Sequence, residues 1–250
     1  MMIATRAKQA LRQGAQWEKR TIGMSSFVPL ALRRRLKHAI RKSLLPEGRR
    51  FFSGRLEDLF RKLDERGACY VVVRWFEDLP HRVDGDIDFL VADDSLDDFE
   101  TVLDRNRVGF PCDVYSESAV EGYRYGNLSY YPPELARRIL DRRISHDASV
   151  SVPCTEDHFF SLAYHCLYHK GPDCGLPTST SGVRPVRAPN HDYRARLEGL
   201  AAELGLSVDM NMEALDALLN EHGWRPAHHV LDRLATENAW LRARLLAERP

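Results

Sequence analysis

Three aspartates in two short segments are the residues in this sequence best suited to chemistry. Asp86 and Asp88 lie two positions apart at the start of an apolar run that ends at Val91. Side chains at positions i and i+2 of a strand project from the same face, so these two carboxylates should stand side by side. Asp113 lies between apolar neighbours in a further predicted strand, where an unpaired acid would be costly. The pattern predicts a three-carboxylate site for two-metal phosphoryl transfer.

Adjacent carboxylates repel each other unless a cation lies between them. A hard divalent ion such as Mg2+, or Mn2+ in its place, would remove the repulsion and leave coordination positions for phosphate oxygens. The alternative is structural: Asp84 and Asp86 would be turn residues around Gly85, and Asp88 would pair with an arginine such as Arg74. The presence of a third acid, Asp113, in a predicted strand favours the metal site over the structural alternative.

A second group of candidate residues lies near the end of a predicted helix. His165 and His169 are four residues apart, so they share a helical face, and zinc could bind there if Cys154 and Cys174 completed the set. The apolar surroundings favour histidines buried in the core instead. A third interpretation places His165, His169 and Lys170 at the mouth of the carboxylate site, where they would bind an acceptor or its phosphate.

The elements that must position these residues follow from the hydrophobic periodicity. An α/β domain is predicted over residues 54–170, with helices at 54–66, 93–104, 132–143 and 155–168 and strands at 69–73, 87–91, 110–115 and 148–152. A Gly-, Pro- and Ser-rich loop or linker follows at 171–190. We expect a C-terminal helical region over 191–250, with helices near 191–204, 211–222 and 226–247.

The N-terminal residues 1–53 are expected to form a basic helical arm. Residues 1–56 contain 14 of the 36 Lys and Arg but only 2 of the 36 Asp and Glu, a net charge of +12, so the rest of the chain carries −12. The amphipathic stretch 29–44 could bind an anionic membrane surface or the acidic remainder of its own chain. It has few interleaved aromatic residues, so nucleic acid is not the expected partner.

The proportions of hydrophobic residues (44%) and charged residues (29%) are typical of a water-soluble chain. The sequence has no apolar run of the roughly 20 residues needed to cross a bilayer and no signal-peptide pattern. Its five cysteines include no Cys-x-x-Cys pair, which argues against a disulfide framework. We therefore expect a cytoplasmic protein, also compatible with peripheral attachment at the inner membrane face.

The order of a strand, an Asp-x-Asp strand, a helix and a third acidic strand resembles the minimal nucleotidyltransferase fold of the DNA polymerase β superfamily. The resemblance implies a small mixed sheet with flanking helices, metal binding by Asp86 and Asp88, and Asp113 as the third catalytic carboxylate. It departs from the family where a small pair should precede the Asp-x-Asp segment, because Arg74 and Trp75 stand there. Arg74 could hold a phosphate through its own guanidinium group.

The expected activity is metal-dependent transfer of a nucleotidyl group from a nucleoside triphosphate to an acceptor hydroxyl. Residues 212–220 and 223–226 resemble segments that accompany bacterial surface-polysaccharide proteins, which suggests that pathway. The alternative is a catalytically inactive binding or scaffold module that retains the fold and is tethered by its basic arm.

Overall fold

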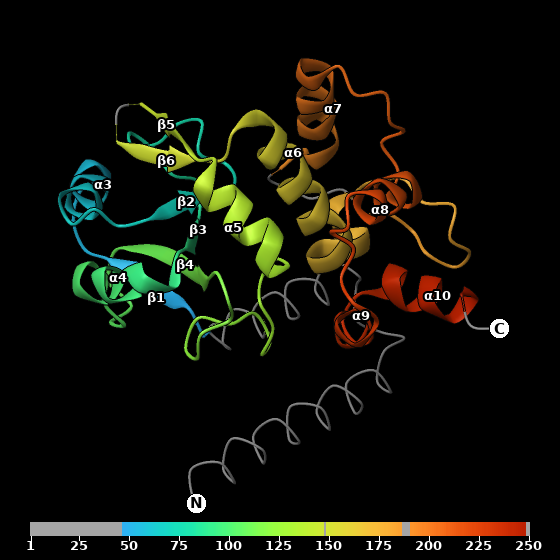
Figure 1. Ribbon diagram of the computed structural model, residues 1–250, viewed down its shortest axis with the longest axis horizontal. Helices are drawn as coiled ribbons and strands as arrows, with labels where there is room; N and C mark the ends of the chain where they lie inside the picture. The colour runs from blue at the N-terminus through green and yellow to red at the C-terminus, as the bar shows by residue number, and fades with distance from the viewer. Residues whose placement is uncertain (1–46, 148, 187–190, 249–250) are drawn as a thin grey trace, which may run out of the picture. The chain divides into compact units, whose positions relative to one another are not determined.

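The described part of the chain is a mixed α/β structure built around a small sheet. The computed structural model describes residues 47–147, 149–186 and 191–248 (Figure 1). Contacts divide the chain into two units, Met1–Leu45 and Pro46–Pro250, and every described residue belongs to the second. The amphipathic stretch 29–44 of the predicted arm therefore lies outside the described residues. None of the described helices is both long and apolar enough to span a bilayer.

A four-stranded mixed sheet organises the first half of the described chain. Its elements are β1 (Arg49–Phe52), α3 (Leu56–Glu65), β2 (Tyr70–Val72), β3 (Ile87–Val91), α4 (Leu96–Val102) and β4 (Phe110–Ser116), with a 3-10 turn at Asp93–Ser95 before α4. The strand order is β1-β4-β3-β2. β3 and β4 are parallel and joined through α4, whereas β1 pairs with β4 and β2 with β3 in antiparallel fashion.

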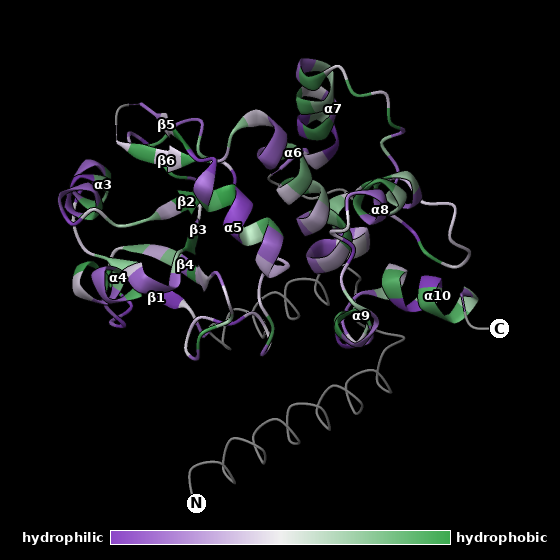
Figure 2. Ribbon diagram, viewed as in Figure 1, coloured by the Kyte–Doolittle hydropathy of each residue, from purple (hydrophilic) through white to green (hydrophobic). Residues whose placement is uncertain are grey.

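Side chains alternate between the two faces of the sheet along each strand, and both faces are buried. Helices α3 and α4 cover one face, where Phe60 and Phe99 contact Tyr70 and Phe89. Intervening strand residues such as Leu90 point to the other face and join the core formed with α5 and α6. Figure 2 shows that β3 and β4 in the centre of the sheet are largely apolar, whereas the visible surface of α3 is largely hydrophilic. A sheet covered on both sides gives its strands continuous apolar runs.

The second half of the chain is mainly helical. It contains α5 (Pro133–Asp141), the hairpin of β5 (Ile144–His146) and β6 (Val150–Val152), α6 (Thr155–Tyr164), a π-helical turn (His165–Lys170), a 3-10 turn (Gly171–Cys174), α7 (Tyr193–Leu204), α8 (Met212–Glu221), α9 (His228–Leu234) and α10 (Ala239–Ala247). Residues of α5, α6 and the C-terminal helices belong to one hydrophobic core. Cys174 and Leu176, which lie between α6 and α7, belong to the same core.

The sequence prediction departs most from the structure at β1, at β5 and in the last predicted helix. The predicted arm 1–53 overlaps β1, which belongs to the central sheet. The strand β5 was not predicted, because its three residues give too short a pattern. The predicted helix 226–247 is two helices, α9 and α10, separated at 235–238. Asn238 causes the break, because its buried side chain caps α10 by accepting a hydrogen bond from the Leu241 amide at 3.0 Å.

We predict that Asn238→Ala lowers the free energy of unfolding by about 1–2 kcal/mol, because it removes both an N-cap and a buried hydrogen bond. The Asn238 amide also donates to the Leu167 carbonyl at 2.6 Å, which links α10 to the π-helical turn. Urea unfolding of the two proteins measures the difference. The exposed Asn106, in the bend after α4, provides a matched Asn→Ala control, and an equal loss in both variants would contradict the capping role.

Candidate functional site

Strand register places the predicted carboxylates in one row with an arginine. Asp88 in β3 lies directly opposite Asp113 in β4, and Asp113 lies opposite Arg49 in β1. Directly opposed residues share a sheet face, so the three side chains are neighbours across three strands. Asp86 immediately precedes β3 and lies two residues before Asp88. The structure thus brings Asp86, Asp88 and Asp113 together on one face of the sheet.

Arg49 joins two of the three carboxylates. Its Nη2 donates hydrogen bonds to Asp86 Oδ2 at 2.9 Å and to Asp113 Oδ2 at 2.8 Å. The Arg49 side chain is 16% exposed, that of Asp113 is 7% exposed, and that of Asp86 is 44% exposed. Sequence reasoning missed Arg49 because it assigned residues 1–53 to a helical arm. The only available signal was the short strand Arg49–Phe52 between two glycines.

The third carboxylate has its own arginine. Arg74 Nη2 lies 2.7 Å from Asp88 Oδ1, and both side chains are at least nine-tenths buried. This is the ion pair considered as the structural alternative from the sequence. The Arg74 guanidinium also lies over the Tyr130 ring, 5.5 Å from its centroid. A phosphate could therefore reach Arg74 only by sharing it with Asp88.

Trp75, the second residue at the expected small pair, is turned toward the C-terminal half of the chain. Its backbone is left-handed, with φ of 55°. The indole stacks on the His191 ring with centroids 4.1 Å apart and meets Tyr193 edge-on. Neither aromatic partner was predicted as a site residue, and nothing in the local sequence around His191 marks it as one.

Burial and mutual repulsion dominate the electrostatics of the cluster. Burial raises the pKa of Asp113 to about 7, the nearby Asp88 adds to the rise, and Arg49 opposes it. Burial likewise raises the pKa of Asp88 against the opposing charge of Arg74. The exposed Lys170 is a further cation close enough to oppose the rise at Asp88. The cluster thus combines three acids with two arginines and a nearby lysine.

His165 and His169 are held in the core by hydrogen bonds. Nδ1 of His165 lies 2.6 Å from the Tyr130 hydroxyl, and Nε2 of His169 lies 2.8 Å from the Tyr130 carbonyl oxygen. Burial lowers the pKa of His165, and it lowers that of His169 to about 3, so both are neutral at pH 7. His165 is buried, as the core interpretation expects, whereas His169 is half-buried.

The zinc set considered from the sequence is not assembled. Cys154 Sγ lies 3.3 Å from Asp157 Oδ2, whereas Cys174 interacts with Cys166. Within residues 47–147, 149–186 and 191–248, no group of three or more His, Cys, Asp or Glu has the arrangement of a metal site as it stands.

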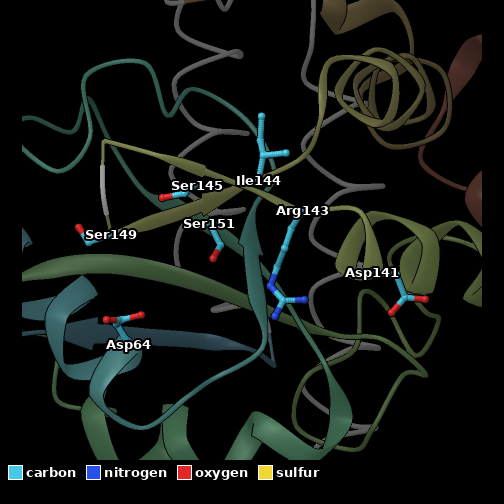
Figure 3. A pocket seen from close by; sticks show the side chains of 7 residues that line it. All are labelled: Asp64, Asp141, Arg143, Ile144, Ser145, Ser149 and Ser151. Atoms are coloured by element: carbon cyan, nitrogen blue, oxygen red, sulfur yellow. The ribbon is translucent and has the colours of Figure 1, made fainter.

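A separate polar pocket lies beside the β5–β6 hairpin (Figure 3). Its lining consists of Asp64, Asp141, Arg143, Ile144, Ser145, Ser149 and Ser151. None of these residues belongs to the carboxylate cluster, and the pocket is open to solvent. We therefore place the candidate site at the cluster, on the chemistry of its side chains.

Comparisons with protein-family models, with curated proteins and with solved structures each found no match to this chain.

Proposed function

We propose that the protein transfers a nucleotidyl group from a nucleoside triphosphate to an acceptor hydroxyl at the carboxylate cluster. The observation that carries this proposal is the register of Asp88 and Asp113 on parallel neighbouring strands, with Asp86 on the same face. The order α3-β2-β3-α4-β4 supports it, since this order resembles the minimal nucleotidyltransferase fold.

The carboxylate oxygens suit Mg2+ or Mn2+, which prefer hard oxygen ligands. Asp86, Asp88 and Asp113 would hold the ion, which when bound supplies the positive charge that phosphate oxygens need. In the arrangement described, Arg49 provides the positive charge between Asp86 and Asp113. Metal binding therefore requires the Arg49 side chain to leave this position.

Other side chains of the cluster have roles that follow from their surroundings. Asp113, with a pKa of about 7, is suited to accept a proton from the acceptor hydroxyl near neutral pH. Lys170 is exposed and so is the cation freest to approach a phosphate group. His165 and His169 are bonded to Tyr130, whose ring lies against the Arg74 guanidinium, so in this proposal they act by holding Tyr130 in place.

A second candidate is a catalytically inactive binding or scaffold module. The observation in its favour is that every acid of the cluster is already paired with an arginine. In this case Arg49 and Arg74 would replace the metal permanently. The basic stretch 29–44 would tether the module to an anionic membrane surface or to a surface-polysaccharide enzyme.

Thermal melts distinguish the two candidates. The wild-type chain is melted with EDTA, with Mg2+ or Mn2+, and with the metal plus each common nucleoside triphosphate. A ligand at ten times its Kd stabilises the folded state by about 1.4 kcal/mol, which is roughly 3–6 °C for a chain of this size. We expect such a shift with metal and a further one with a triphosphate.

Asp86→Asn should weaken this response, because it removes one metal-binding charge from an exposed side chain. Asp84→Asn is the matched control: Asp84 lies two residues earlier and pairs with the exposed Arg82. Equal melting-temperature responses in the two variants would show that Asp86 does not bind the metal. A wild-type protein that responds to neither metal nor triphosphate would contradict transferase function and favour the inactive module.

A further inference from the structure

Arg49 occupies the position between two carboxylates where the proposed function needs a divalent cation. We infer that Arg49 is an exchangeable counter-ion, which competes with the metal for Asp86 and Asp113 and becomes free to bind an anionic ligand when the metal enters. This inference rests on the proposed function. It assigns a role to a residue of β1, outside the segment that resembles a nucleotidyltransferase.

The contacts of Arg49 permit exchange. Its bond to Asp86 faces solvent, because the Asp86 side chain is 44% exposed. Solvent and salt weaken such a contact. On the buried side, Arg49 Nε lies 2.6 Å from Asp113 Oδ1, but this contact lacks hydrogen-bond alignment, and both atoms are otherwise without a hydrogen-bond partner. Arg49 therefore holds Asp113 through one hydrogen bond, from Nη2 at 2.8 Å, and one close ion contact, so the solvent-facing bond to Asp86 is the weaker side of the bridge.

The strand that carries Arg49 is anchored independently of its side chain. Arg50 points to the opposite face, is 1% exposed, donates to Glu100 Oε1 at 2.6 Å and lies over the Tyr123 ring. The Val114 amide donates to the Gly48 carbonyl at 3.0 Å, which fixes the backbone just before Arg49. The Arg49 side chain can therefore leave Asp86 and Asp113 while β1 stays in the sheet.

Exchange would couple the two ligands of the site. A divalent ion brings more charge to the carboxylates than one guanidinium, and it releases a planar donor suited to phosphate oxygens. A triphosphate in turn attracts the released Arg49 and keeps it from returning. Metal and triphosphate should therefore bind cooperatively, and Arg49 should set the metal affinity of the empty protein.

The test is calorimetric titration of the full chain, stripped with EDTA, with Mn2+ alone. We expect Arg49→Gln to bind Mn2+ at least about tenfold more tightly than wild type, because the competing charge-assisted hydrogen bonds are gone. Arg50→Gln is the matched control, since it removes a neighbouring arginine from the opposite face. It should lower the melting temperature and leave the Mn2+ affinity unchanged.

Equal Mn2+ affinity in wild type and Arg49→Gln would overturn the competition and leave the proposed function standing. Loss of binding in Arg49→Gln would also overturn it. Binding by neither protein would overturn the proposed function together with the inference. If Arg49→Gln fails to fold by circular dichroism, Arg49→Lys decides the matter: lysine keeps the charge without the planar fork, so we expect an intermediate affinity, and wild-type affinity would overturn the inference.

Discussion

Replacing Arg74 with methionine should lower the free energy of unfolding by about 3–5 kcal/mol, because it leaves Asp88 as a buried carboxylate without its partner. The Arg74 and Asp88 side chains are 8% and 9% exposed, and their closest atoms lie 2.7 Å apart. The neighbouring Asp113 adds repulsion, which only the more distant charges of Lys170 and Arg49 would then oppose. Urea unfolding in EDTA at pH 7.5 measures the loss.

Two further variants separate the ion pair from general damage. Arg82 and Asp84 form an exposed pair 2.8 Å apart with both side chains 67% exposed, so Arg82→Met should change stability by less than about 0.5 kcal/mol. The double variant Arg74→Met with Asp88→Leu removes both charges and should recover most of the loss. A cost below about 1 kcal/mol for Arg74→Met would show that Asp88 does not depend on Arg74.

The protein should lose stability in acid through its buried neutral histidines. Burial, with a contribution from the positive charge of Arg196, lowers the pKa of His158 to about 3 from an ordinary value of 6.5. Above pH 6.5 the ring is neutral in both the folded and unfolded states. As the pH falls from 6.5 toward 3, the unfolded state takes up a proton that the folded state excludes. Stability is therefore complete above pH 6.5 and decreases below it.

For His158 alone the loss between pH 8 and pH 4.5 should be about 2–3 kcal/mol. Asp113 acts in the opposite sense, since its raised pKa of about 7 stabilises the folded state as the pH falls. The contribution of His158 is therefore measured as the difference between the pH dependence of stability in wild type and in His158→Leu. Relative to wild type, His158→Leu should gain about 2–3 kcal/mol of stability on going from pH 8 to pH 4.5.

The exposed His229 is the control for the acid measurement, because its surroundings change little on unfolding. His229→Leu should follow the wild-type pH dependence. Parallel pH curves for wild type and His158→Leu would show that His158 is protonated in the folded protein and would contradict its buried, neutral state.

Two arginines balance the negative charge of the carboxylate cluster on one face of the sheet. Arg74 lies at the inner, buried end of the cluster, and Arg49 lies at the outer end beside the exposed Asp86. A buried guanidinium in a tyrosine-rich setting is expensive to remove, whereas a partly exposed one can exchange. We therefore expect Arg74 to act in folding and Arg49 to act in ligand binding.

Sequence periodicity was sufficient to determine the elements around the cluster. The strand Ile87–Val91 was predicted at its observed bounds, and the helix before β2 and the strand containing Asp113 were predicted to within two residues at each end. Alternation placed Asp86 and Asp88 on one face, because strand side chains repeat every two residues. The local pattern is sufficient here because the buried side of each of these elements is strongly apolar.

Tertiary structure alone decided how the charges are partnered. Nothing near Asp113 in the sequence points to Arg49, 64 residues away, since their proximity depends on the antiparallel pairing of β1 with β4. Strand β1 has only four residues, too few for periodicity to register. The break at Asn238 likewise depends on the carbonyl of Leu167, 71 residues away. Cross-strand and cross-helix partners depend on register and packing, which a single sequence does not encode in any local pattern.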